Sequence, residues 1–175
     1  MRRLLAALAL AAFIVPLATT SQPEPVAAEA GVRVSGVGVQ TLSLTVADLA
    51  SMPRTTLIVS DRDDQRNKYE GVALEAILTK AGMAFGQSMR GPRLRDFVLA
   101  ESPDKYGAVF AIAEISEEFS ERRIIVADKV NGAPIAGRDG PLRLIVSDEK
   151  KHARWVRGVT SLTVRTAAPE EPAAK

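Results

Sequence analysis

The stretch GPLRLIVSDEKKHARWVRGVTSLTVR, residues 140–165, places a cationic segment between two apolar runs. The runs PLRLIVS and VTSLTVR are rich in β-branched residues and predict two strands. The segment SDEKKHARW between them predicts a loop held by two scaffolded elements, and such loops often carry binding sites. It contains the only histidine and the only tryptophan of the chain. The stretch therefore predicts part of a β-rich core together with a candidate binding loop.

Two interpretations of this loop are open from the residues alone. In the first, its basic side chains donate hydrogen bonds to an anion or a polar ligand edge; they are Lys150, Lys151, His152 and Arg154. Trp155 then offers the ligand a flat face and one N–H donor. In the second, the segment runs extended and alternate side chains point to opposite faces. Trp155 then lies in the core and the cations face water.

The rest of the chain consists of short, mixed elements. We expect strands at residues 41–45, 55–61, 94–102, 106–112 and 122–130, and short helices at 46–52, 72–82 and 113–121. Asn131-Gly132 favours positive φ at both positions and predicts a hairpin turn. No internal repeat is present. The pattern predicts an α+β domain with a mixed, mostly antiparallel sheet and a few short helices.

Composition excludes several kinds of site. The chain has no cysteine, which excludes disulfides, thiolate nucleophiles and thiolate metal ligands. A single histidine makes a His-based zinc site improbable. The glycine-rich phosphate-binding motifs and the GxSxG motif of hydrolases are absent from the sequence. The net charge of +2 argues against nucleic acid as a partner, so electrostatic recognition must come from local clusters.

The two ends of the chain differ from the middle. Residues 1–30 begin with Arg2-Arg3, continue with an apolar run and end in small and polar residues, which predicts a signal peptide and linker. This implies a periplasmic or secreted protein, with an uncleaved membrane anchor as the alternative. Residues 31–166 predict one domain. Residues 167–175 are rich in Pro, Ala and Glu and predict a disordered tail.

Three segments, taken in order, resemble the molybdopterin-binding domain of the sulfite oxidase family. They are YEGVALEAILTKAG (69–82), SPDKYGAVFAIAEI (102–115) and the opening stretch, residues 140–165. The resemblance runs from about residue 42 to residue 165. It implies the sulfite-oxidase-type fold, a pterin-type ligand beside the KYG segment that contains Tyr106, and basic residues in the last segment that hold the cofactor's phosphate.

The sequence departs from the family at the metal ligand. Enzymes of the family ligate molybdenum through a cysteine on a loop that here reads SDRDDQRNK, residues 60–68, without cysteine. Molybdenum is therefore not expected, and catalysis is in doubt. The chain resembles cysteine-less, exported members of the family. That resemblance implies a pterin-like ligand bound without metal, and a role as a sensor or ligand-presenting module for the periplasmic domain of a membrane signalling protein.

Under this interpretation, the loop and the KYG segment recognise a planar ligand. Trp155 or Tyr106 stacks on the pterin, and carboxylates accept hydrogen bonds from its amide and amino edge; the candidates are Asp104, Asp148 and Glu101. Two alternatives remain open. One is a molybdopterin-dependent oxidoreductase with an atypical metal site, and the other is an interaction module that binds no small ligand.

Overall fold

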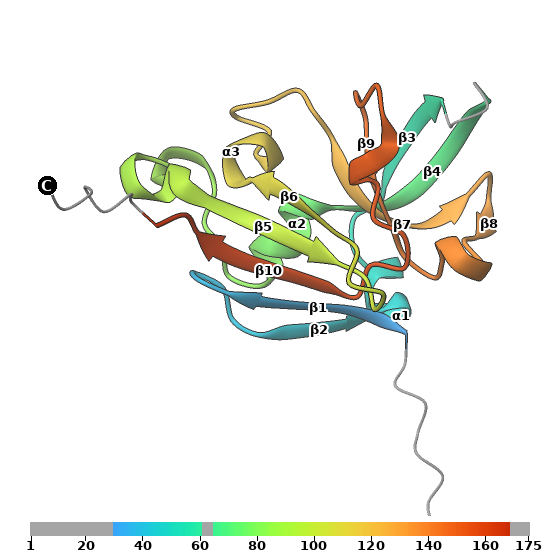
Figure 1. Ribbon diagram of the computed structural model, residues 1–175, viewed down its shortest axis with the longest axis horizontal. Coiled ribbons are helices and arrows are strands. Elements are labelled where there is room, and N and C mark those ends of the chain that lie inside the picture. The colour runs from blue at the N-terminus through green and yellow to red at the C-terminus, as the bar shows by residue number, and fades with distance from the viewer. Residues whose placement is uncertain (1–29, 61–64, 169–175) are drawn as a thin grey trace, which may run out of the picture.

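The computed structural model describes residues 30–60 and 65–168, which form two β-sheets around a shared core (Figure 1). The first sheet has the strand order β2-β1-β10-β5-β6. Its strands are β1 (Gly31–Gly36), β2 (Leu42–Thr45), β5 (Asp96–Glu101), β6 (Gly107–Ala111) and β10 (Ser161–Thr166). The pair β1 and β10 is parallel, whereas the other neighbours in this sheet are antiparallel.

The second sheet has the order β3-β4-β7-β8, with β9 also paired to β7. Its strands are β3 (Thr55–Ser60), β4 (Arg66–Ala73), β7 (Ile124–Val130), β8 (Ala133–Pro134) and β9 (Arg143–Val146). All of these pairs are antiparallel. The α+β class and the mixed, mostly antiparallel pairing predicted from the sequence are confirmed.

Three short helices accompany the sheets: α1 (Val46–Ala50), α2 (Leu74–Lys80) and α3 (Ile112–Ile115). α1 begins with a capping box, in which Thr45 and Asp48 exchange hydrogen bonds. α2 follows β4 directly and buries Leu74, Ile77 and Leu78. None of the described helices is long and apolar enough to span a membrane.

Three sequence expectations need correction. β1 was not expected, and β4 begins at Arg66, inside the segment expected to be a loop. The helix expected at 113–121 is a single turn that ends at Ile115. Ser116 leaves it with extended backbone, so the acidic residues that follow lie in turns.

The strands that were expected around residue 140–165 are present, and they join the two sheets. β9 belongs to the second sheet and β10 to the first, so the loop between them crosses from one sheet to the other. Leu144 and Leu162, one from each strand, are fully buried in the same core. This crossing places the cationic segment at the junction of the sheets.

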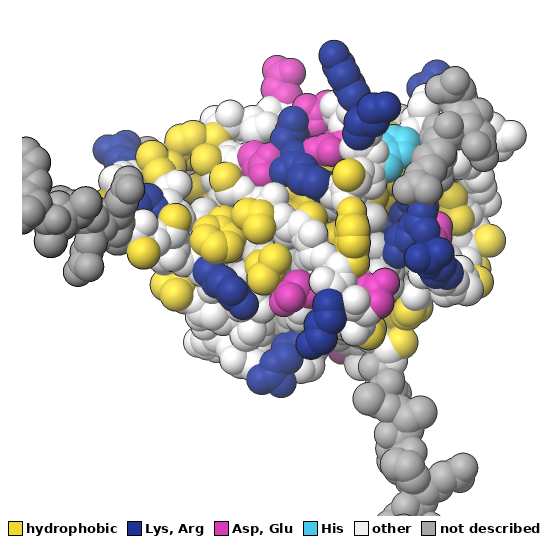
Figure 2. Space-filling model, in the orientation of Figure 1, with side chains coloured by type: hydrophobic (Ala, Val, Ile, Leu, Met, Phe, Trp, Pro, Cys, Tyr) yellow, Lys and Arg dark blue, Asp and Glu magenta, His cyan; other side chains and the backbone are white. Residues whose placement is uncertain are grey.

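The predicted signal peptide and tail fall almost entirely on residues 1–29 and 169–175, which lie outside the described residues. The domain boundaries therefore stay predictions. On the face drawn in Figure 2, Lys and Arg side chains are interspersed with Asp and Glu, and the single histidine lies at the surface beside them.

Candidate functional site

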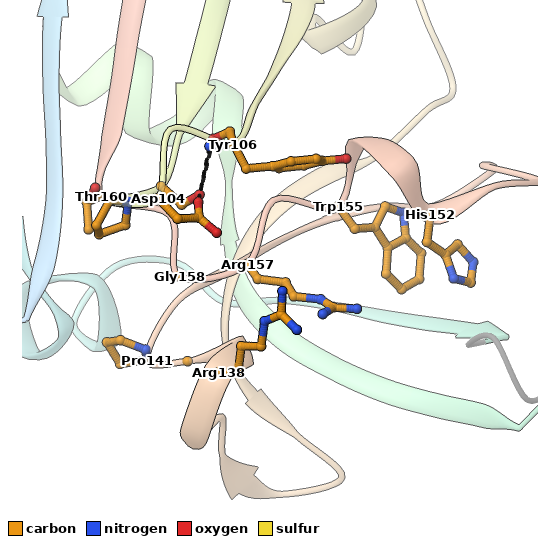
Figure 3. Close-up of a pocket in the computed structure, with 12 residues that line it drawn as sticks. Asp104, Tyr106, Arg138, Pro141, His152, Trp155, Arg157, Gly158 and Thr160 are labelled. Carbon is orange, nitrogen blue, oxygen red and sulfur yellow. Dashed lines mark hydrogen bonds between the residues drawn. The ribbon is translucent and has the colours of Figure 1, made fainter.

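A cavity of about 570 Å³ opens where three loops meet (Figure 3). Its walls come from the β5–β6 turn (residues 102–106), the segment before β9 (138–141) and the segment between β9 and β10 (152–160). Pockets that hold small molecules commonly enclose about 300–1,000 Å³. The cavity is therefore large enough for a bicyclic ligand with a substituent.

One wall of the cavity is aromatic. Trp155 is 3 % exposed, and the Tyr69 ring meets it edge-on with centroids 5.8 Å apart. The ring of His152 stacks on the indole, with centroids 3.8 Å apart and an interplanar angle of 19°. The indole N–H is buried and finds no acceptor among the described residues. Trp155 thus lines the cavity and also belongs to the core.

The conformation of the loop explains this double role. His152–Arg154 forms a 3₁₀ turn, η4, so the segment does not run extended as the second interpretation required. Trp155 leaves that turn toward the core, while Val156 donates and accepts backbone hydrogen bonds that tie the chain to Arg154 and Leu144. Burial of Trp155 and contact with the cavity are therefore compatible.

A second wall carries two arginines. Arg138 and Arg157 both line the cavity and extend toward the same region of Figure 3. Arg157 Nε forms an ion pair with Asp139 Oδ1 at 3.1 Å, and Arg143 Nη1 donates to Asp139 Oδ2 at 3.0 Å. Across the described residues, no hydrogen bond or ion pair engages the Arg138 guanidinium. Such a wall can receive an anionic group.

The third wall is the β5–β6 turn. Asp104 Oδ1 accepts from the Ser102 hydroxyl at 2.6 Å and from the Tyr106 N–H at 3.1 Å. The Ser102 hydroxyl and then the Tyr106 N–H lower the pKa of Asp104, so its carboxylate stays ionised. The turn is completed by Lys105 with φ of 69°. Asp104 therefore offers an acceptor to a ligand's N–H edge.

Tyr106 fixes this turn against the loop on the other side of the cavity. Its hydroxyl donates to the carbonyl oxygen of Ala153 in η4, and its ring is half exposed at the cavity rim. The contact joins the β5–β6 turn to the turn that carries His152. The aromatic side chain thereby closes one side of the cavity.

The structure brings together only some of the residues proposed from the sequence. Asp104, Tyr106, His152 and Trp155 line the cavity. The others lie outside its walls, namely Lys150, Lys151, Arg154, Asp148 and Glu101. Lys150 and Lys151 are exposed. Asp148 accepts from Arg122 Nε at 2.7 Å and Nη2 at 3.0 Å, and these bonds lower its pKa.

Arg154 was expected to donate to a ligand, but its donors are used within the protein. Its guanidinium donates to Glu149 through Nε and Nη2, and to Glu114 through Nη1 at 3.0 Å and Nη2 at 3.4 Å. Nη1 also donates to the Val109 carbonyl at 3.2 Å. These bonds account for all five N–H donors of an arginine. In this conformation Arg154 fastens η4 to β6 and α3 instead of facing the cavity.

We predict that Arg154→Ala affects stability more than ligand affinity. The substitution leaves Glu114 and Glu149 without their shared cation, and should lower the free energy of unfolding by about 1–2 kcal/mol. Urea denaturation measures this, with Lys150→Ala as a stability control because it removes the same charge from an exposed position. A variant that unfolds like the wild type but binds pterins at least tenfold more weakly would instead make Arg154 a ligand donor.

The residues that sequence reasoning missed are Arg138, Arg157, Ser102 and Thr160, all of which line the cavity. Arg157 lies two residues after Trp155, so extending the candidate loop to the start of the next strand would have included it. Arg138 lies in the segment RDGP, where the turn residues were the available signal. Both arginines adjoin glycines with positive φ, Gly137 at 64° and Gly158 at 55°.

The residues that line the cavity fit the pterin ring and the phosphate of a molybdenum cofactor better than they fit its metal. The arginines and the ionised carboxylate suit a phosphate and a pterin edge. The chain contains no cysteine, and the described residues include no cluster of His, Asp and Glu that could hold a metal ion. Part of the loop that carries the family's cysteine, residues 61–64, lies outside the described residues.

Comparisons with known proteins identify the family of the chain. The family described as oxidoreductase molybdopterin binding domain matches residues 63–172. Among solved structures, the sulfane dehydrogenase SoxCD from Paracoccus pantotrophus is similar, with a TM-score of 0.58 and 19% identity. The match covers 77% of this chain and 37% of that chain, and at this identity it shows the fold alone. No curated protein sequence matches. The resemblance seen in the sequence is confirmed: the chain belongs to the oxidoreductase molybdopterin-binding domain family, of the sulfite oxidase type.

Proposed function

We propose that the cavity binds a pterin-like ligand without a protein-ligated metal, and that the protein is an exported ligand-binding module. One observation carries the proposal: a single cavity presents an indole, an ionised carboxylate and two arginines. A pterin is planar, has an amide and amino edge rich in N–H donors, and carries a substituent that is often anionic. The aromatic residues of the cavity match the ring, Asp104 matches the N–H edge, and the two arginines match the anionic substituent.

The orientation of the ligand follows from the positions of the walls. The half-exposed Tyr106 ring at the cavity rim offers the pterin a face for stacking, because His152 already stacks on the Trp155 indole and only 3% of Trp155 is exposed. Its amino edge faces Asp104, whose carboxylate accepts hydrogen bonds. Its anionic substituent faces Arg138 and Arg157.

The protein should release a pterin when it is denatured, and it should not carry stoichiometric molybdenum. The metal-free part of this expectation rests on the absence of cysteine from the chain. The protein is purified from its native compartment under mild, anaerobic conditions and then denatured. The fluorescence spectrum of the released material and elemental analysis of the protein are the two measurements.

The outcomes separate the proposal from its alternatives. Molybdenum at one equivalent would favour a molybdopterin-dependent oxidoreductase with an atypical metal site. Absence of any released ligand, together with no binding of added reduced pterins, would favour an interaction module that binds no small molecule. A released pterin without molybdenum supports the proposal.

Export is the second part of the proposal, and it rests on the basic and apolar pattern of residues 1–30. We expect residues up to about Ala30 to be absent from the mature protein. The Ala30 carbonyl accepts a hydrogen bond from the Val46 N–H at 3.0 Å, so a cut after Ala30 would remove this bond but leave β1, which begins at Gly31, intact. Mass spectrometry of the N-terminus tests this. Retention of Met1 in a membrane fraction would favour the anchor.

The sensor role concerns what the bound ligand does. In this proposal the output of the module is ligand binding rather than turnover. We propose that it presents its ligand state to the periplasmic domain of a membrane signalling protein. Crosslinking in intact cells, with and without pterin, tests this. Capture that does not depend on the ligand would contradict a sensor.

A further inference from the structure

A second hollow, of about 400 Å³, lies at the end of the first sheet that is far from the cavity. It is lined by Asp96, the first residue of β5, and by Thr166, the last residue of β10. These two residues face each other in the antiparallel pairing of the strands. The cavity instead begins at Ser102, which follows β5, and includes Thr160, which precedes β10 (Figure 1). The two sites can therefore be occupied at the same time.

The walls of this hollow are largely apolar. Val37, Ala84 and Pro92 line it, and 53% of the surface of Val37 is exposed. Gly38 and Gly82 complete the wall, and a Cβ added to either would meet nothing within 4 Å. The space beside these glycines is therefore open. An apolar side chain from another molecule can enter here and cover Val37.

Four arginines lie in or next to the segments that form the hollow. Arg93 lines it, and the other three are exposed beside its lining residues, namely Arg90, Arg95 and Arg165. Arg93 Nη1 donates to the Ser88 hydroxyl at 3.5 Å, and among the described residues no ion pair engages any of the four. Asp96 also lines the hollow, but it is 8% exposed and its Oδ1 accepts from the Thr166 hydroxyl at 2.5 Å. The accessible charge at this end is therefore positive.

The combination of a hollow with free arginines favours a protein segment over a lipid surface. Protein interfaces are dominated by anchor side chains that fill pockets, and arginines bind carboxylates through two parallel hydrogen bonds. A bilayer offers no single side chain that could fill a hollow, and it is bound through a larger apolar face than one leucine provides. Leu94 in η2 (Gly91–Arg95), which is 45% exposed, is the large apolar side chain that this turn presents.

We infer that this end of the first sheet is a docking surface for an acidic segment of another protein, in which carboxylates flank an apolar side chain. The apolar side chain enters the hollow beside Val37, Ala84 and Pro92, and the carboxylates meet the four arginines. The inference does not depend on the proposed function, because the surface is formed by residues outside the cavity. A partner bound here leaves the cavity open to its ligand.

The test uses two fluorescein-labelled peptides, EDLDE and EDSDE, which share their charge and differ in the central side chain. Fluorescence anisotropy measures their binding to the full chain. We expect EDLDE to bind roughly tenfold more tightly than EDSDE, because its leucine is buried in the hollow. Both affinities should fall as salt is added, because the arginines are exposed. A protein that binds neither peptide, or that binds both equally, would overturn the inference.

Two variants separate the charges from the hollow. Arg93→Glu combined with Arg95→Glu should weaken the binding of both peptides at least about tenfold. Its matched control is Lys150→Glu combined with Lys151→Glu, which makes the same charge change at exposed positions outside the surface and should stay within about twofold of the wild type. Equal losses in the two double variants would indicate unspecific attraction and overturn the inference.

Ala84→Tyr fills the hollow from an exposed position and leaves every charge in place. We expect it to abolish the preference for EDLDE over EDSDE and to keep the weaker binding of EDSDE. Circular dichroism shows whether each variant is folded. If the arginine variant does not fold, Ala84→Tyr decides, and a folded Ala84→Tyr protein with the wild-type preference would overturn the inference.

Further measurements test other occupants of the surface. Vesicles of equal parts phosphatidylglycerol and phosphatidylcholine that sediment with the wild type, in a protein that binds no peptide, would overturn the inference in favour of a membrane. Glu170→Gln combined with Glu171→Gln neutralises two carboxylates that follow β10 in the same chain. If this variant binds EDLDE at least about tenfold more tightly, the chain's own end occupies the surface and the inference fails. Pterin affinity should not change in any variant, and a protein that binds EDLDE but no pterin would uphold the surface and refute the proposed function.

Discussion

Trp155→Ala is expected to lower the free energy of unfolding by about 3–5 kcal/mol, the usual cost of removing a buried tryptophan. The side chain is 3% exposed and is packed against Tyr69 and His152. The Arg143 guanidinium also lies over its ring, at 5.4 Å from the centroid. Truncation would open a void at the point where both sheets meet the cavity. Urea denaturation followed by circular dichroism measures the loss without needing the indole as a probe.

Tyr106→Ala is the matched control for this prediction. Tyr106 also lines the cavity, but 48% of its surface is exposed and it contributes little to the core. We expect its removal to cost less than about 1 kcal/mol, because its main contact is one hydrogen bond to Ala153. Equal losses in the two variants would contradict the assignment of Trp155 to the core. Trp155→Phe should lie between them, because it keeps an aromatic ring in the core.

The two interpretations of residues 150–155 could not be separated from the sequence because both are partly true. Local spacing predicts which side chains alternate in a strand, but here the chain makes a 3₁₀ turn. Tyr69 packs edge-on against Trp155 and comes from β4, which lies far from Trp155 in the sequence. A contact of that range depends on how β4 pairs with β7, which no local pattern specifies.

Arg154 shows a second reason why the site could not be predicted fully from the sequence. Its spacing beside a tryptophan was typical of a ligand-binding arginine, yet two glutamates from separate elements satisfy it. Glu149 is local, but Glu114 belongs to α3, and for that region the sequence predicted a helix that continues to residue 121. In the structure Glu114 forms ion pairs with Arg122 at 2.6 Å and with Arg154 at 3.0 Å. These pairs join segments that are distant in the sequence, so local spacing does not predict them.

The elements that the sequence predicted well are those whose signals are local. The Asn131-Gly132 turn has φ of 50° and 83°, and it joins β7 to β8 as expected. The turn at 102–105 and the strands beside it also lie where the pattern indicated. β1 was missed; it pairs with the nearby β2, but its other neighbour is β10, at the opposite end of the domain, and no local pattern specifies that parallel pairing.

Some residues that line the cavity were predicted from local sequence signals, and others depend on long-range contacts. Asp104 and Tyr106 were found because they lie in a turn with a recognisable sequence. Arg138 and Arg157 were missed because their membership depends on two glycine turns that bring separate loops to one wall. The missed residues carry the positive charge of the site, whereas the predicted lysines, Lys150 and Lys151, are exposed outside it. The sequence predicted a cationic region, and in the structure the arginines that line the cavity are Arg138 and Arg157.

Gly71→Ala should lower the free energy of unfolding by about 3 kcal/mol, the upper end of the usual cost of overpacking. Gly71 lies in the YEGV segment, in a central strand between β3 and β7, where the pairing register shifts after Glu70. A Cβ at this position would lie 2.2 Å from the Val126 carbonyl oxygen and 2.5 Å from the Ala127 Cα. Both are backbone atoms of a buried strand, so relief requires β4 and β7 to separate.

Gly107→Ala is the matched control, because Gly107 lies at the start of edge strand β6 and the nearest atom to an added Cβ is 3.2 Å away. We expect this variant to lose less than about 1 kcal/mol, since an edge strand can shift by a few tenths of an ångström. Urea denaturation of the two variants gives the comparison. Equal stabilities would show that β4 and β7 tolerate a methyl group between them. A selective loss in Gly71→Ala would explain the glycine in YEGV by strand packing alone, without any role in ligand binding.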